Sequence, residues 1–241
     1  MTNADSVRIA KPTIAEVLAH FLAEQKPRIT PKTFSKYEYV IELLQHSLNG
    51  YAYASLDKAS AALFDRLYNA KGADRREFCE IFGPEHILSN VGEFLDDFMV
   101  RKVIAGKEML RAAGTVTKKL AKWLAEKGYV EAEDAEEAAQ RGSDAARELP
   151  ETKDLASVLY EFTENEERGE EEDDIEDHFT LTRVEPAKIW LRGMMDEREV
   201  GPIAVPEEIS RRCKVGWSIS GVVGRVGKRW RLVESWNVYP W

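Results

Sequence analysis

The sequence predicts an α+β protein in which a helical bundle, an acidic linker and a small β-barrel follow one another along the chain. Apolar residues recur every three or four positions over the first 130 residues, as on one face of a helix. From Phe179 onward the apolar spacing changes to two, as in strands, and glycines separate the short runs. Between these parts, residues 131–180 carry 20 Asp and Glu against 4 Lys and Arg. We therefore expect three modules, at residues 1–130, 131–177 and 178–241.

Capping residues mark the starts of the first two helices. Thr13 and Glu16 form a capping box ahead of an apolar stripe, and Thr30 precedes Pro31 at the start of a second stripe. The second helix is expected to end at Asn49, which precedes a glycine. Shorter helical segments follow at about residues 57–68, 75–82 and 85–100.

A helix expected at residues 107–127 carries an apolar side and a basic side. At about 100° per residue, the apolar side gathers Met109, Ala113, Val116, Leu120, Trp123 and Leu124. The basic side shows Lys107, Arg111, Thr115, Lys118, Lys119 and Lys122. A helix of this kind can lie against a phosphate backbone. The alternative is a solvated surface, because two nearby glutamates, Glu108 and Glu126, can pair with its cations.

The middle of the chain is acidic. Residues 131–140 and 155–162 are expected to form short helices, because their Ala and Glu content and their apolar spacing favour helix. The run from Glu164 to Asp177 is rich in Asp and Glu and has few apolar residues. Like charges this dense repel one another and favour a solvated, extended linker. Mimicry of a nucleic acid is the minor alternative for this run.

The last 60 residues are expected to form short strands joined by tight turns. Strands are predicted at residues 179–184 and 188–192, an extended segment at 202–206, a short helix at 206–212 and a hairpin of 217–223 with 229–234. Several short strands with glycine turns suggest a small barrel. The close glycines from Gly221 to Gly227 lie inside the hairpin, so turn geometry explains them better than phosphate binding.

We find no catalytic constellation in the sequence, and we expect no enzyme activity, no metal and no cofactor. None of the histidines has the spacing of a metal ligand; they are His20, His46, His86 and His178. Phosphate-binding loops and nucleophile elbows are missing. Cys79 and Cys213 are expected to be free thiols in a reducing cytoplasm. No apolar run is long enough for a membrane helix, so we expect a cytoplasmic protein without a membrane partner.

Three segments of the helical part carry a resemblance to a known family. They begin Thr13-Ile-Ala-Glu-Val-Leu, Thr30-Pro-Lys-Thr-Phe-Ser-Lys-Tyr and Thr115-Val-Thr-Lys-Lys-Leu-Ala-Lys-Trp. Over roughly residues 12–130 the chain resembles the core-binding domain of tyrosine recombinases, the phage integrases, which serve DNA recombination. The resemblance implies a SAM-like helical bundle that clamps duplex DNA with its second and last helices. Carried over, the DNA contacts would be Lys32, Thr33, Lys36, Thr115, Lys118, Lys119 and Lys122.

The remainder of the chain departs from that family. Its catalytic domain needs a His-x-x-Arg motif and a tyrosine nucleophile, but no histidine here has Arg three residues on. The residues after Val130 are too few for that domain. We therefore expect an integrase-like, non-catalytic DNA-binding protein whose barrel recognises another protein. The alternative is a protein–protein adaptor that has lost DNA binding, which the net charge of −9 favours. In a third interpretation the barrel binds RNA or a single strand through exposed Trp or Tyr.

Overall fold

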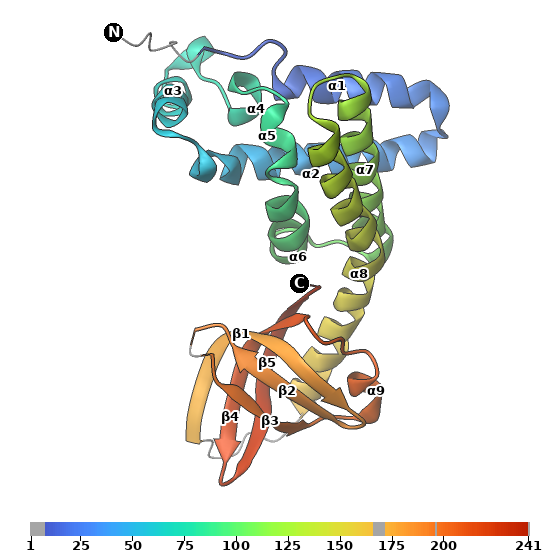
Figure 1. Cartoon of the computed structure of the whole chain (residues 1–241), viewed down its shortest axis with the longest axis vertical. Coiled ribbons are helices and arrows are strands. Elements are labelled where there is room, and N and C mark those ends of the chain that lie inside the picture. Colours follow the sequence, from blue (N-terminus) through green and yellow to red (C-terminus); the bar gives the residue numbers. More distant parts are fainter. Residues whose placement is uncertain (1–7, 166–171, 196, 241) are drawn as a thin grey trace. The chain divides into compact units, whose positions relative to one another are not determined.

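A computed structural model of the chain describes residues 8–165, 172–195 and 197–240 (Figure 1). It confirms a mixed α+β protein, with a helical N-terminal region followed by five strands. The chain divides into two compact units, which are Met1–Met99 with Glu108–Ala146, and Val100–Lys107 with Arg147–Trp241. The sequence placed module boundaries at residues 130 and 177 instead.

Seven α-helices precede the long helix that leads to the sheet, within the part of the chain described. They are α1 (Ile14–Gln25), α2 (Pro31–Tyr51), α3 (Lys58–Tyr68), α4 (Phe78–Ile81), α5 (Glu85–Leu88), α6 (Met99–Arg101) and α7 (Lys107–Glu126). The predicted caps are confirmed, since the side chain of Thr13 accepts a hydrogen bond from the backbone of Glu16 and that of Thr30 from Thr33. Helix α2 runs past Asn49 to Tyr51.

The helix predicted at residues 85–100 is instead interrupted after Leu88, and its continuation contains a π-helical stretch. Helix α5 ends at Leu88, a π-helix spans Glu93–Phe98, and α6 follows. Asn90 explains this interruption, because its side-chain amide donates to the carbonyl of His86 at 2.8 Å. That bond competes with the backbone ladder of a regular helix.

Glu24 ties the end of α1 to the end of α7. Its carboxylate accepts a hydrogen bond from Trp123 Nε1 at 3.1 Å and pairs with the ammonium of Lys127. His20 Nε2 lies 3.0 Å from the same carboxylate. The hydrogen bond from Lys127, then that from Trp123, lowers the pKa of Glu24 to about 2.

One long helix, α8 (Ala132–Asn165), replaces the two short helices predicted at residues 131–140 and 155–162. It continues through Pro150, which supplies no backbone donor and normally interrupts a helix. Buried side chains on both sides of the proline hold it, since Leu149 and Leu155 are each at most 1% exposed. Packing here overrides the local preference for a break.

The second unit is built on β1 (Glu172–Glu185), β2 (Lys188–Gly193), β3 (Glu199–Ala204), β4 (Ser218–Val226), β5 (Arg229–Tyr239) and the short helix α9 (Glu207–Ser210). Strand β1 pairs with β2 and β4, β2 with β3, and β4 with β5, all antiparallel. Strands β3 and β5 run parallel and pair at Ile203 and Trp230. The core between them includes Leu155 and Leu159 of α8 with Phe179, Leu191 and Ile219.

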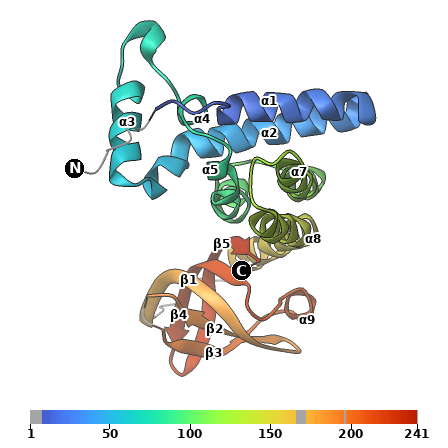
Figure 2. The same cartoon turned by 45° about the horizontal axis from the view of Figure 1, so that its top comes forward.

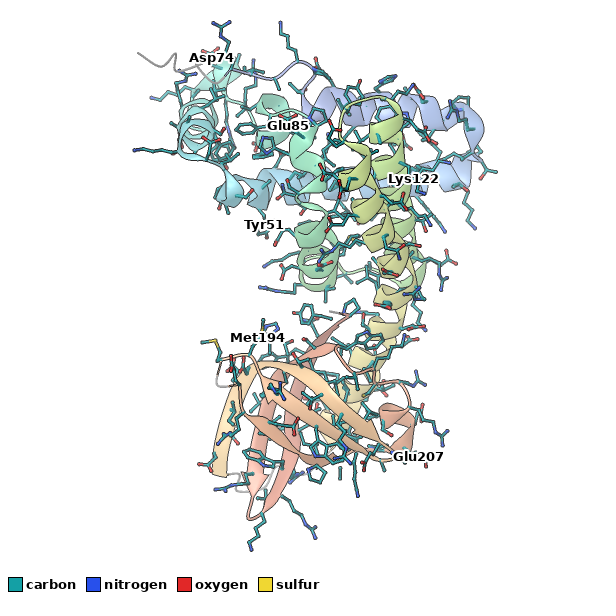
Figure 3. All side chains as sticks on the ribbon, in the orientation of Figure 1. Tyr51, Asp74, Glu85, Lys122, Met194 and Glu207 are labelled. Carbon is teal, nitrogen blue, oxygen red and sulfur yellow. The ribbon has the colours of Figure 1, made fainter. Side chains whose placement is uncertain are left out.

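The acidic run predicted as a linker is partly secondary structure. Glu164 belongs to α8, residues 166–171 lie outside the described part of the chain, and residues 172–177 belong to β1. Asp177 is 9% exposed, and its carboxylate accepts hydrogen bonds from the backbone of His178 at 2.7 Å and of Met195 at 2.9 Å. It thereby anchors the turn after β2, where Met194 projects away from the sheet (Figure 3). Ile175, Asp177 and Phe179 alternate along β1 with their side chains on the inward face. The sequence did not reveal this part of the strand, because one of the inward positions is an acid instead of an apolar residue.

Each unit contains one cysteine. Cys79 and Cys213 are both buried and unpaired, as predicted for free thiols. Burial raises the pKa of each thiol to about 12. In the described residues, no helix combines the length and the apolar character that spanning a membrane requires.

Candidate nucleic-acid interface

Helix α7 carries most of the residues predicted to contact DNA. Its apolar side is buried, since none of these side chains is more than 3% exposed: Ala113, Val116, Leu120, Trp123 and Leu124. Met109, predicted on the same stripe, is only partly buried. The polar side is exposed at Arg111, Thr115, Lys119 and Lys122. The predicted division of this helix into an apolar and a basic side is confirmed at these positions.

Helix α8 packs against one flank of α7 at very short range (Figure 2). A Cβ atom added at Gly114 would lie 2.3 Å from the backbone nitrogen of Ala146 and 2.4 Å from the carbonyl oxygen of Gly142. Only glycine lets two backbones approach this closely. Lys118 lies at the crossing, where its Nζ donates to Ser143 Oγ at 3.2 Å. It is therefore partly buried between two helices and not on an open basic face.

Lys122 lies one turn further along the flank of α7 that faces α8 (Figure 3). Its Nζ is 3.8 Å from Glu136 Oε2 of α8, so Glu136 takes the place of the partner predicted from the sequence, Glu126. An exposed ion pair of this length contributes little to stability. The pair leaves Lys122 able to exchange its partner for another anion.

A cation of α2 pairs with the carboxylate of Glu108 at the start of α7. Lys36 Nζ lies 2.9 Å from Glu108 Oε2, and the Glu108 side chain remains 80% exposed. The hydrogen bond and charge of Lys36 lower the pKa of Glu108, and the charges of Lys32 and Arg111 add to that effect. We call Lys32, Lys36 and Arg111 the cation cluster. The sequence predicted all three as DNA contacts but did not predict that Lys36 pairs with Glu108 or that the other two cations act on the same carboxylate.

The two threonines predicted as contacts use their hydroxyls within their own helices. Thr33 Oγ1 lies 3.0 Å from the capping hydroxyl of Thr30. Thr115 Oγ1 donates to the carbonyl of Arg111 at 2.8 Å. These bonds serve the helices, and neither threonine belongs to the cation cluster.

Two further predicted cations differ in their surroundings. Lys107 Nζ pairs with Asp154 Oδ1 at 2.6 Å, and both residues belong to the second unit. Lys119 is exposed and makes no ion pair or hydrogen bond with its side chain in the described residues. Of these two, only Lys119 belongs to the same unit as the cation cluster and is open to an anion.

A cleft of about 520 Å³ on the first unit has the opposite charge. Four carboxylates line it, from Glu85, Glu131, Asp134 and Glu137. Its one cation among the described residues, Arg141, is already paired with Asp96. This lining repels phosphate, so the cleft is not part of a nucleic-acid interface.

Sequence reasoning missed a second group of cations, which lies in the second unit. Lys188, Arg229 and Arg231 line a hollow together with Trp230. The run Lys228-Arg229-Trp230-Arg231 is the signal that could have indicated it, because basic residues flank an aromatic one.

The structure shows no metal centre in the residues it describes, because no three His, Cys, Asp or Glu side chains there are close enough to hold an ion. Comparison of this chain with protein-family models, with curated proteins and with solved structures finds no match.

Proposed function

We propose that this protein binds duplex DNA without cleaving it, using the cation cluster and Lys119 of the first unit. One observation carries the proposal: Lys36 of α2 holds the exposed carboxylate of Glu108 in α7, and the charges of Lys32 and Arg111 also act on that carboxylate. A group of cations that holds a carboxylate has the charge and the donors to hold a phosphate. The resemblance of residues 12–130 to integrase core-binding domains points to the same two helices.

Exchange of Glu108 for a phosphate is energetically reasonable. An exposed Lys–Glu pair contributes about 0–1 kcal/mol, so little is lost when Lys36 leaves Glu108. A phosphate of duplex DNA brings a condensed counterion layer, and each neutralised phosphate releases about one counterion. Binding is therefore expected to be weak, salt-dependent and largely independent of base sequence.

The proposal is tested by fluorescence anisotropy of a labelled 20-bp duplex with the full chain. Replacing the cluster by Lys32→Gln, Lys36→Gln and Arg111→Gln should raise Kd at low salt by about tenfold or more. The slope of log Kd against log salt concentration should also fall, by the equivalent of about two to three phosphate contacts. A matched control removes three exposed cations of and beside α3 by Lys58→Gln, Arg66→Gln and Lys71→Gln. It lowers the net charge equally and should change Kd by less than about twofold.

A change of the opposite sign makes the test sharper. Glu108→Gln removes the internal competitor of phosphate and should tighten duplex binding several-fold at low salt, with the gain disappearing as salt rises. Equal effects of the cluster and control triple variants, or no effect of Glu108→Gln, contradict the proposed site.

The second candidate is a protein–protein adaptor. It is favoured by the ion pairs that Lys36 and Lys122 already make and by the net charge of −9. If the full chain fails to bind the duplex at low salt while its helical circular dichroism is intact, the adaptor replaces DNA binding as the best assignment.

We also infer that the five strands close into a small barrel that serves as a partner-recognition module. The pairings run from β1 through β2, β3, β5 and β4 and return to β1. The interior of a small closed barrel of this size is packed with side chains, so its ligands bind on the outer surface and the loops.

A further inference from the structure

A hollow of about 530 Å³ lies in the second unit, beside the parallel pairing of β3 with β5. Its apolar wall is formed by Phe162 of α8, Pro202 and Ala204 of β3, and Trp230 of β5. Trp230 and Phe162 are partly buried and pack against the core of the unit, whereas Pro202 and Ala204 are exposed. This volume lies within the range of small-ligand sites in proteins.

The rim of the hollow is positively charged on both sides. Lys188 stands at the start of β2, opposite Ala204 of β3, whereas Arg229 and Arg231 flank Trp230 in β5. No carboxylate is among the described residues that line the hollow. Neither Lys188 nor Arg229 has an ion-pair or hydrogen-bond partner for its side chain in the described part of the chain. Among the described residues, Lys188 and Arg229 therefore give the hollow positive charge without a paired carboxylate, in contrast to the acidic cleft of the first unit.

Trp230 contributes an aromatic side chain to the lining of the hollow. The guanidinium carbon of Arg198 lies 5.4 Å from the centroid of its ring. Tryptophan with a neighbouring arginine is the combination on which unpaired bases stack, since every base has a π-face and arginine adds a cation–π contribution. Duplex DNA does not offer a free base face to such a surface.

We infer that this hollow binds a nucleotide of a single-stranded nucleic acid, with its base against Trp230 and Phe162. The phosphates on either side of that nucleotide contact Lys188 on one side and Arg229 on the other. Cations on both sides favour a strand that passes through the hollow over a free mononucleotide, which has phosphate on one side only. This site is separate from the duplex site proposed for the first unit and does not depend on it.

The test measures binding of fluorescein-labelled dT12 to the full chain at low salt. Lys188→Gln with Arg229→Gln should raise Kd for dT12 by about tenfold or more and leave duplex binding unchanged. The matched control is Arg211→Gln with Arg212→Gln, which removes two exposed cations that are paired with glutamates near α9. The control should change Kd for dT12 by less than about twofold.

A 12-mer of abasic sites tests the role of the base without any change in the protein. It has the same phosphate charge as dT12 but nothing to stack, and it should bind about tenfold more weakly or worse. The cation-cluster variant of the first unit should lose duplex binding and keep dT12 binding, which separates the two sites.

Three results would each overturn the inference. The first is that the abasic strand and dT12 bind equally well. The second is that the Lys188→Gln, Arg229→Gln variant and the unchanged chain have the same affinity for dT12. The third is that dTMP or a 12-residue polyglutamate competes against labelled dT12 as strongly as unlabelled dT12 does. The polyglutamate result would indicate an acidic protein partner instead.

Discussion

Gln25, at the end of α1, is a polar side chain held inside the apolar core of the first unit. It is 1% exposed, and neither its amide nitrogen nor its amide oxygen has a hydrogen-bond partner in the described residues. An unpaired buried amide costs about 1–3 kcal/mol relative to an apolar group of the same shape. The unpaired amide of Gln25 therefore lowers the free energy of unfolding relative to an apolar side chain at this position.

Replacement of this amide by a thioether of similar length should stabilise the protein. We expect Gln25→Met to raise the free energy of unfolding by about 1–2 kcal/mol, measured by urea denaturation. Gln140→Met, on the exposed side of α8, is the control and should change it by less than about 0.5 kcal/mol. A loss of stability in Gln25→Met would show that the amide has a partner in solution.

Glu24 makes stability depend on pH in the acid range. Because its pKa falls from an ordinary 4.5 to about 2 in the folded protein, its contribution is present above pH 4.5 and is lost as the pH falls towards 2. The Tm difference between the unchanged chain and Glu24→Gln should be constant above pH ~5.5 and shrink to zero near pH ~2. Glu42→Gln, at an exposed carboxylate without a partner in the described residues, should show no such trend. A Tm difference independent of pH would exclude the ion pairs as its cause.

At the scale of elements, the crossing of α7 and α8 rests on two glycines. Gly114→Ala would place a methyl group 2.3 Å from the backbone of α8, and Gly142→Ala would place one 2.7 Å from the backbone nitrogen of Lys118. Because backbone cannot move aside as a flexible side chain can, each change should lower the free energy of unfolding by about 1–3 kcal/mol. Thermal unfolding followed by circular dichroism measures this loss.

Gly50→Ala provides the control for the glycine pair, because it lies in α2 with nothing within 4 Å of an added Cβ. It should stabilise the protein by about 0.4–1 kcal/mol, since alanine restricts the unfolded chain more than glycine does. Tolerance of alanine at Gly114 would mean that the helices are further apart in solution than the structure shows.

Local signals predicted those elements that local chemistry specifies. The caps at Thr13 and Thr30 and the hairpin turn at Gly227, whose φ is +61°, were readable because each needs particular residues. The broken segment after α5 and the continuous α8 were not readable. In the first, the side chain of Asn90 takes a backbone acceptor, and in the second, tertiary packing holds a helix across Pro150.

The candidate site was predicted residue by residue but not as an assembly. Periodicity marked the basic side of α7 as exposed, which the structure confirms at Arg111 and Lys119. It could not reveal that Lys36 of α2 reaches Glu108, because that contact joins residues 72 positions apart. Nor could it show that α8 covers the flank with Lys118, because that depends on the approach of Gly114 to Gly142.

At the scale of the whole molecule, each unit has its own core, and a fragment experiment tests the independence of the second. A fragment of residues 147–241 contains every residue of the β-unit core, including Leu155 and Leu159. We expect it to fold, with the blue-shifted fluorescence of buried Trp217, which is 3% exposed. A fragment of residues 166–241 lacks both leucines, each worth about 2–5 kcal/mol when buried, and should not fold. Folding of the shorter fragment would show that α8 is dispensable for this core.

The two buried thiols have a practical consequence. With a pKa near 12, each is ionised in roughly one molecule in 10⁵ at pH 7, and alkylating reagents attack the thiolate. Reaction therefore has to wait for a local or global opening that exposes the sulfur. Because Cys79 belongs to the first unit and Cys213 to the second, the alkylation rate of each cysteine reports the opening of its own unit. Mass spectrometry of the two tryptic peptides during slow alkylation would measure both opening rates in one sample, without any label or substitution.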